Sequence, residues 1–127
     1  MKKIFVPLLA ATLAFGAACA NDATSPSVSI TGNWTLRTLN GQSLPVQTAF
    51  NTVVTSEQRT LNPDGSYNDI VTYSNGSSSS EFGFYTITGN SITFTDQTDN
   101  NFQYTGSISG NVLTTFDGNF TSVYQKS

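Results

Sequence analysis

The residue types that usually carry enzyme chemistry are scarce in this sequence. It contains no histidine, which removes the commonest general base and the commonest metal ligand. Serines are plentiful, but none lies in a Gly-x-Ser-x-Gly segment, the turn that exposes a nucleophilic serine in many hydrolases. The one cysteine, Cys19, lies near the N-terminus. Because no acid–base pair can be assembled from these residue types, we expect neither an enzyme nor a cofactor.

Two acidic residues, Asp96 and Asp99, lie close together in the segment TDQTDNN. Carboxylates at such a spacing could bind a hard cation through oxygen. The segment lacks the Asp-x-Asn-x-Asp-Gly run and the distal glutamate of a calcium-binding loop, so we interpret it as a solvated hairpin tip. Asp64 and Asp117 each precede a glycine, where the geometry of a tight turn explains them. The sequence therefore predicts no metal site.

Glu57 and Arg59 are two residues apart and would share one face of a strand. On the surface they would form an ion pair worth less than ~1 kcal/mol. If that face is internal, the same two side chains become a polar floor for a ligand. Charged residues are seldom buried, which favours the surface position.

The first twenty residues, MKKIFVPLLAATLAFGAACA, have the layout of a secretory signal peptide. Two lysines precede an apolar run, and small residues follow it. The run from Ile4 to Ala18 has fifteen residues, fewer than the ~20 that a spanning helix needs. The polar segment NDATSPS comes directly afterwards, which argues against a permanent transmembrane helix.

Two cleavage chemistries compete at the end of this segment. Ala18-Cys19-Ala20 fits ordinary signal peptidase, whereas Gly16-Ala17-Ala18-Cys19 resembles a bacterial lipobox, in which the cysteine becomes the diacylated first residue. The lone cysteine and the polar stretch after it favour the second interpretation. We therefore expect a lipoprotein signal peptide at 1–18, lipidation of Cys19 and a flexible tether at 19–30. Two acyl chains hold a protein stably at a membrane, so we expect an exported, membrane-anchored protein of the bacterial cell envelope, in the outer membrane or facing the periplasm.

The composition of the remaining chain excludes one class of partner and favours one fold class. From Cys19 onward three cations, Arg37, Arg59 and Lys126, stand against eight acidic residues. Such a chain has no electrostatic footprint for a phosphate backbone, so we expect no nucleic-acid binding. Thr, Ser, Asn and Gln take the place of Lys and Glu, and together with aromatic residues, Val and Ile they favour strands over helices.

Short alternating runs separated by turn sequences predict a chain of hairpins. The two-residue Gly-Asn and Asp-Gly links require antiparallel neighbours, and no link is long enough for a parallel crossover. NGSSSS, at 75–80, is predicted as a flexible loop. The eight predicted strands cover residues 33–40, 49–63, 66–74, 81–88, 91–97, 102–109, 112–116 and 120–126.

An open meander of eight strands would leave two exposed edges, and closure into an up-and-down barrel removes both. Eight strands enclose room for side chains or for one small ligand. We therefore predict an all-β fold, an antiparallel eight-stranded up-and-down meander that closes into a small barrel. A sandwich or an open meander is the alternative, and pairing of the first strand with the last would decide. The predicted inward-facing residues are Trp34, Leu36, Phe84, Ile92, Phe94, Phe102, Tyr104, Val112, Phe116, Phe120 and Tyr124.

Gly32-Asn33-Trp34 on the first strand resembles the lipocalin signature. Together with ITGNWTLRTLNGQSLP, LNPDGSY, FGFYTITGNSITF and ISGNVL, it is similar to the small lipocalin-like domains of bacterial lipoproteins. The resemblance implies a lipocalin-like barrel domain over 31–127. It also implies that Trp34 plugs one end of the barrel, with a cation over its ring from Lys126 or, in another register, from Arg37 or Arg59.

These features lead to one favoured function and one alternative. The favoured function is a membrane-tethered lipocalin-like binding module that holds a small apolar ligand. Its candidate ligand-binding residues are aromatic: Trp34, Phe84, Phe94, Phe102 and Tyr104. A core plug is nevertheless the favoured role of Trp34. The alternative is a structural or protein-interaction lipoprotein with a solid core, an unknown partner and an outer apolar patch that includes Val54 and Leu61.

Overall fold

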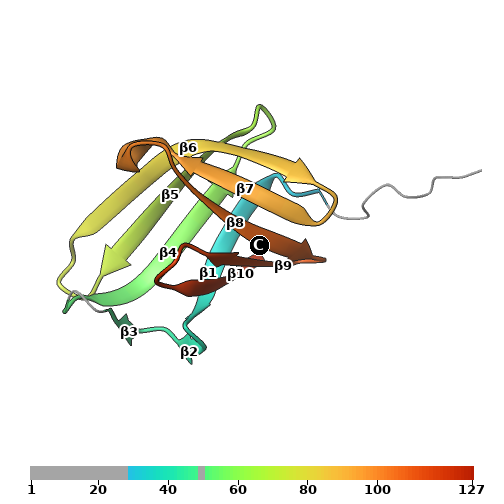
Figure 1. Cartoon of the computed structure of the whole chain (residues 1–127). Coiled ribbons are helices and arrows are strands. Elements are labelled where there is room, and N and C mark those ends of the chain that lie inside the picture. The colour runs from blue at the N-terminus through green and yellow to red at the C-terminus, as the bar shows by residue number, and fades with distance from the viewer. Residues whose placement is uncertain (1–28, 49–50) are drawn as a thin grey trace, which may run out of the picture.

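The structure is a computed structural model that describes residues 29–48 and 51–127 (Figure 1). The predicted signal peptide, Cys19 and nearly all of the tether lie outside the described residues. No helix in the described ranges is long and apolar enough to cross a membrane. The elements are β1 (Gly32–Leu39), β2 (Gln42–Ser43), β3 (Val46–Gln47), β4 (Val53–Leu61), β5 (Ser66–Tyr73), β6 (Ser78–Thr88), β7 (Ser91–Asp96), the 3-10 helix η3 (Gln97–Asp99), β8 (Phe102–Ser109), β9 (Val112–Phe116) and β10 (Thr121–Lys126).

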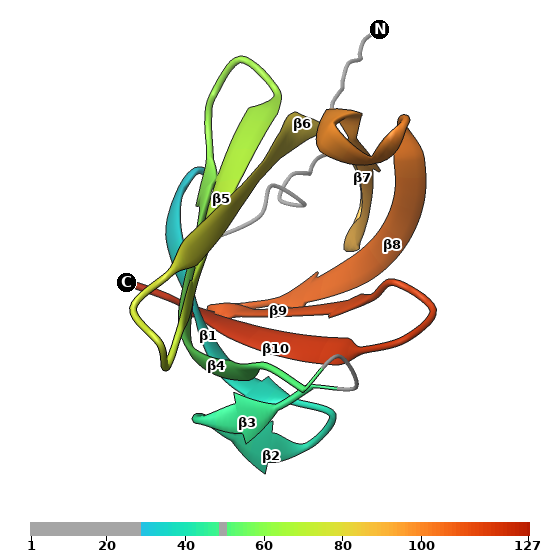
Figure 2. The same cartoon turned by 90° about the vertical axis from the view of Figure 1, so that its left-hand side faces the viewer.

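The eight long strands, β1 and β4 to β10, form a closed antiparallel barrel, as predicted. Each strand from β4 to β10 pairs with its neighbour in sequence, and β1 pairs with both β10 and β4. Trp34 on β1 marks the closure, since it lies opposite Lys126 on one side and Arg59 on the other. Figure 2 shows these strands arranged as a ring, with β2 and β3 beside the lower part of it. Closure satisfies both edges of the meander.

β6 contains a glycine, Gly83, at a position without room for a side chain. Gly83 pairs with Asp96 on β7, and a Cβ at this position would overlap the main-chain carbonyl of Thr95. Glycine within a strand is typical of sites where another backbone approaches closely. β6 also begins at Ser78, so the prediction of a loop over all of 75–80 is wrong for its last three serines.

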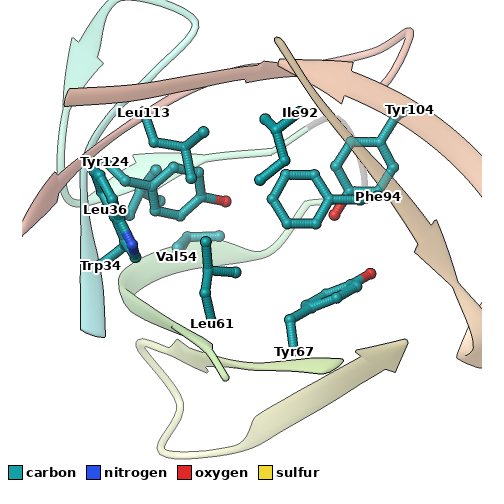
Figure 3. Packing of buried hydrophobic residues seen from close by; sticks show 10 residues of the cluster. All are labelled: Trp34, Leu36, Val54, Leu61, Tyr67, Ile92, Phe94, Tyr104, Leu113 and Tyr124. Atoms are coloured by element: carbon teal, nitrogen blue, oxygen red, sulfur yellow. The ribbon is translucent and has the colours of Figure 1, made fainter. Parts of the chain in front are cut away.

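The interior packs ten buried apolar and aromatic side chains into one cluster (Figure 3). Phe94 is fully buried, and its ring centroid lies 5.0 Å from that of Tyr67 and 5.2 Å from that of Tyr104. Edge-to-face and offset contacts of this kind stabilise aromatic clusters beyond the area that they bury. The cluster comprises Trp34, Leu36, Val54, Leu61, Tyr67, Ile92, Phe94, Tyr104, Leu113 and Tyr124.

The predicted inward-facing set is correct for β7 and β10 and wrong for β9. Val112 and Phe116 are exposed, while Leu113 and Thr115 are buried. On β6, Phe84 is 51% exposed, because the chain presents Gly83 to the interior instead. A one-residue error in register inverts every side chain of a strand, which explains these corrections.

A bulge on β4 corrects the prediction that Val54 and Leu61 belong to an outer patch. The register between β4 and β5 shifts between Val54 and Ser56, so Val54 shares the inner face with Glu57, Arg59 and Leu61. Val54 is 5% exposed and Leu61 is 1% exposed. An extra residue in one strand locally reverses the alternation of inward and outward side chains, and the period of the sequence does not reveal such a residue.

Candidate binding cavity

The barrel encloses a cavity of about 600 Å³ that opens at the end carrying η3 and the turn between β9 and β10. All eight long strands contribute to its lining. Apolar and aromatic walls come from Leu36, Leu39, Val54, Val71, Tyr73, Phe102, Tyr104, Phe120 and Tyr124. Charged lining residues are Glu57, Arg59, Glu81, Asp96, Asp99 and Asp117. Cavities of 300–1,000 Å³ with apolar walls and a few polar groups are typical of small-ligand sites.

The floor of the cavity is built around one buried guanidinium. Arg59 Nη2 donates to Asp69 Oδ2 at 2.8 Å. Glu57 Oε2 lies 3.7 Å from the same nitrogen, and Glu81 Oε2 lies 4.0 Å from it. Three carboxylates from β4, β5 and β6 therefore surround one cation. Burial of charges is costly unless they are paired, and the three carboxylates supply the opposite charge on the Nη2 side of the arginine.

Four aromatic rings enclose the other side of the guanidinium. Arg59 Cζ lies 4.7 Å from the ring centroid of Phe94 and 5.0 Å from that of Tyr124. The rings of Tyr67 and Tyr104 lie at 5.4 and 5.7 Å. Within the described residues, the Nε and Nη1 groups of Arg59 have no hydrogen-bond acceptor. Ring faces attract the cation electrostatically, and they take the place that an acceptor would otherwise occupy.

Tyrosine hydroxyls tie the carboxylates to the aromatic cluster. Tyr67 and Tyr104 both donate to Glu81 Oε2, at 2.6 and 2.8 Å, and Tyr124 donates to Glu57 Oε2 at 3.1 Å. Burial raises the pKa of all three tyrosines, so they stay neutral and act as donors. Figure 3 shows the hydroxyls of these three side chains within the barrel interior.

The two glutamates hold their protons more tightly than exposed carboxyls do. Burial raises the pKa of Glu57 well above its ordinary value, and its contact with Asp69 raises it further despite the nearby Arg59. For Glu81, burial is again the largest cause of a raised pKa, and Arg59 and the tyrosine hydroxyls oppose it. The polar floor is thus a proton-binding cluster, because one cation cannot offset the negative charges of two buried carboxylates and a partly buried third.

Asp96 and Asp99 lie at the mouth of the cavity, on and beside η3. Asp96 caps this helix, and its Oδ1 accepts hydrogen bonds from the main chain and the hydroxyl of Thr98. Asp96 is 7% exposed, so the prediction of a fully solvated tip is wrong for this residue. Among residues 29–48 and 51–127, no three His, Cys, Asp or Glu side chains form a group that could hold a metal ion.

The cavity includes two of the five predicted ligand-binding residues. Phe102 and Tyr104 line it. Phe94 is fully buried under Arg59 and does not reach the lining, and Phe84 faces outward from β6. Ligand contact at Phe102 and Tyr104 stays a prediction.

Trp34 is fully buried among the core residues and does not line the cavity. Its indole nitrogen donates to the main-chain oxygen of Ile30 at 2.9 Å, which fixes the chain that leads into β1. Lys126 donates from Nζ to the carbonyl of Ser29 at 2.7 Å. Among the described residues no cation lies over the Trp34 ring, since the guanidinium of Arg59 contacts the four rings named above.

Sequence reasoning favoured a surface position for Glu57 and Arg59, and the structure shows the internal alternative. One signal was present: Leu61 follows at the same two-residue spacing, and an apolar residue on that face indicates burial. The role of Asp69 was missed. It alternates with Tyr67 and Val71 on one face of β5, a pattern that also indicates an inward position.

A closed eight-stranded up-and-down barrel, plugged at one end by a tryptophan and hollow at the other, defines a lipocalin-like fold. Two solved structures share it. A lipocalin-like protein from Bacteroides uniformis aligns with a TM-score of 0.51 and 22% identity, over 77% of this chain and 98% of that chain. An uncharacterized protein from Bacteroides eggerthii aligns with a TM-score of 0.50 and 16% identity, over 78% and 100%. The fold resemblance inferred from the sequence is thereby confirmed.

No model of a known protein family matches this chain, and no curated protein matches it.

Proposed function

We propose that this protein is an exported, membrane-tethered binding module that holds a small ligand in its barrel without catalysing a reaction. The observation that carries the proposal is the cavity of about 600 Å³ at the open end of a lipocalin-like barrel. Its walls offer apolar surface from Leu36, Leu39, Val54 and Phe102. Burial of apolar ligand surface against such walls contributes about 25 cal/mol per Å².

Occupancy of the cavity can be tested with a neutral fluorescent probe, N-phenyl-1-naphthylamine. Ser122 lines the cavity from β10, and Ser122→Phe would place a ring in the space that the probe needs. Gln125, on the same strand, is exposed, so Gln125→Phe is the matched control. We expect saturable fluorescence enhancement with wild type and Gln125→Phe, and at least a tenfold weaker response with Ser122→Phe. Equal responses from all three proteins would refute binding in the barrel.

Tethering through Cys19 rests on the sequence alone. The test is palmitate labelling and membrane fractionation of the wild-type chain and of Cys19→Ser in a bacterial host that processes lipoproteins. We expect label and membrane association with wild type, and loss of both with Cys19→Ser. An unlabelled wild-type protein would support cleavage by ordinary signal peptidase.

A second candidate function is protein interaction through the outer face of β5 and β6. Ile70, Phe82 and Phe84 are each about half exposed there, at 49%, 54% and 51%, and Phe82 lies opposite Asn68 on β5. Large apolar side chains gathered on an outer face are typical of interaction sites. Cross-linking in intact cells tests this function. Cross-links lost in Phe82→Ser and Phe84→Ser, but kept in Ser122→Phe, would favour it over ligand carriage.

A further inference from the structure

We propose that the ligand of this cavity carries a cationic group, an amine or a guanidine, that is held by Glu57 and Glu81 above the floor. The inference rests on the proposed function, because it names the ligand class of the same site. The expected ligand is therefore amphipathic, with its charged end pointing inward, and not purely apolar.

The charge of the lining favours a cationic ligand. Five of the lining residues are carboxylates, and within the described part of the chain Arg59 is the one cation among them. Three of those carboxylates, Asp96, Asp99 and Asp117, lie at the mouth, and two lie at depth. A cleft lined by one sign of charge raises the local concentration of ligands of the opposite sign.

Arg59 is already occupied by contacts within the protein. Its Nη2 is bonded to Asp69, and its Nε and Nη1 groups are buried beside the aromatic rings. An anionic ligand would therefore find no accessible donor on this guanidinium, and it would also meet the surrounding carboxylates.

The two glutamates each have an oxygen that can still accept a hydrogen bond. The side chain of Glu57 is nine-tenths buried and lines the cavity. Its Oε2 accepts from Tyr124, while its Oε1 accepts no hydrogen bond from any described residue. Glu81 shows the same division, since both tyrosine hydroxyls donate to Oε2. The buried Glu57 and the partly buried Glu81 each keep a free oxygen at the base of the cavity, and such oxygens match an ammonium donor.

An aromatic wall lies beside these oxygens. Tyr104 and Tyr124 line the cavity next to the glutamates, and both rings already contact the cation of Arg59. Aromatic rings beside a carboxylate-lined space are compatible with a second cation through the same quadrupole attraction. A bound cation also favours the ionised glutamates, so ligand binding should release protons.

The test uses three probes with one scaffold: 2-phenylethylamine, 2-phenylethanol and 3-phenylpropionate. Each is titrated calorimetrically at low salt and pH 7.5 into exported protein carrying Cys19→Ser, which removes the acyl acceptor and the need for detergent. We expect the amine to bind at least tenfold more tightly than the alcohol, and the carboxylate to bind more weakly than either. Repeating the amine titration in buffers of different ionisation enthalpy should show net proton release, absent for the alcohol.

Three substitutions separate the site from general electrostatics. Glu57→Gln and Glu81→Gln should each weaken amine binding about tenfold and leave alcohol binding unchanged. Asp64→Asn, at an exposed turn outside the cavity, should leave both unchanged. If the probes bind equally and the glutamine variants change nothing, the cationic ligand class is overturned while the binding module stands. If the neutral naphthylamine probe also fails to bind wild type, the proposed function falls as well.

Discussion

Arg59 and Asp69 lie directly opposite each other on β4 and β5, and Arg59 Nη2 donates to Asp69 Oδ2 at 2.8 Å in the barrel interior. Both side chains are almost completely buried. The pair fixes the position of the guanidinium beneath the cavity. It thereby determines which carboxylates remain available to a ligand.

Removal of Arg59 should destabilise the barrel strongly. Arg59→Met leaves Asp69 and Glu57 buried without their cation, and breaking a buried ion pair costs about 3–5 kcal/mol. Arg37→Met is the matched control, because Arg37 is exposed on β1 and should change stability by less than ~0.5 kcal/mol. Urea unfolding measures both. Equal stability of the two variants would contradict the central role of the guanidinium.

The stability of the protein should depend on the protonation of Glu57. Burial raises the pKa of this carboxyl above its ordinary value of 4.5, so the folded state binds the proton more tightly than the unfolded chain. The resulting stabilisation is complete below pH 4.5 and is lost as pH rises through the raised pKa. Unfolding free energies measured from pH 4.5 to 8 should therefore fall with pH, and fall less steeply in Glu57→Gln. Parallel curves for the two proteins would show that Glu57 does not titrate in this range.

Trp34, the one tryptophan of the chain, reports directly on the closed end of the barrel. Because it is fully buried, its emission should be blue-shifted and resistant to acrylamide quenching until the protein unfolds. Trp34→Phe removes the donor to Ile30 and part of the core packing, and we expect a loss of about 1–3 kcal/mol. A red-shifted, easily quenched emission from the folded protein would contradict the plug.

Gly83→Ala tests the close approach of β6 and β7. A Cβ here would overlap the Thr95 carbonyl, and overpacking of this kind costs about 1–3 kcal/mol. Ser80→Ala, on the exposed part of the same strand, is the control and should be close to neutral. Thermal unfolding distinguishes the two variants. A Gly83→Ala protein as stable as wild type would mean that β6 and β7 lie further apart.

The fold followed from the sequence because its signals are local. Gly89 and Gly110 adopt positive φ in tight turns between consecutive strands, and these turns alone require antiparallel neighbours. Because each link has too few residues for a crossover, consecutive strands must form a meander. Closure of this meander into a barrel removes its two exposed edge strands. The register of individual strands did not follow, since the bulge after Val54 and the inward Gly83 are set by contacts with other strands.

The candidate site was predictable only in part. The spacing of Glu57 and Arg59 indicated a shared face, but whether that face points inward depends on the closed barrel. Asp69 and Glu81 join them through strand pairing across β4, β5 and β6. These residues are too far apart in the sequence for a local pattern to predict the contact. The aromatic rings that enclose Arg59 come from four different strands, so their convergence is a property of the fold.

Native mass spectrometry of the barrel purified from its source cells tests the central claim, ligand binding in the cavity, most directly. Wild type and Gln125→Phe should carry the added mass of a small molecule, and Ser122→Phe should not. Fragmentation of the released species should identify an amine or a guanidine. Bare protein masses for all three would contradict a carrier and leave the outer face of β5 and β6 as the functional surface.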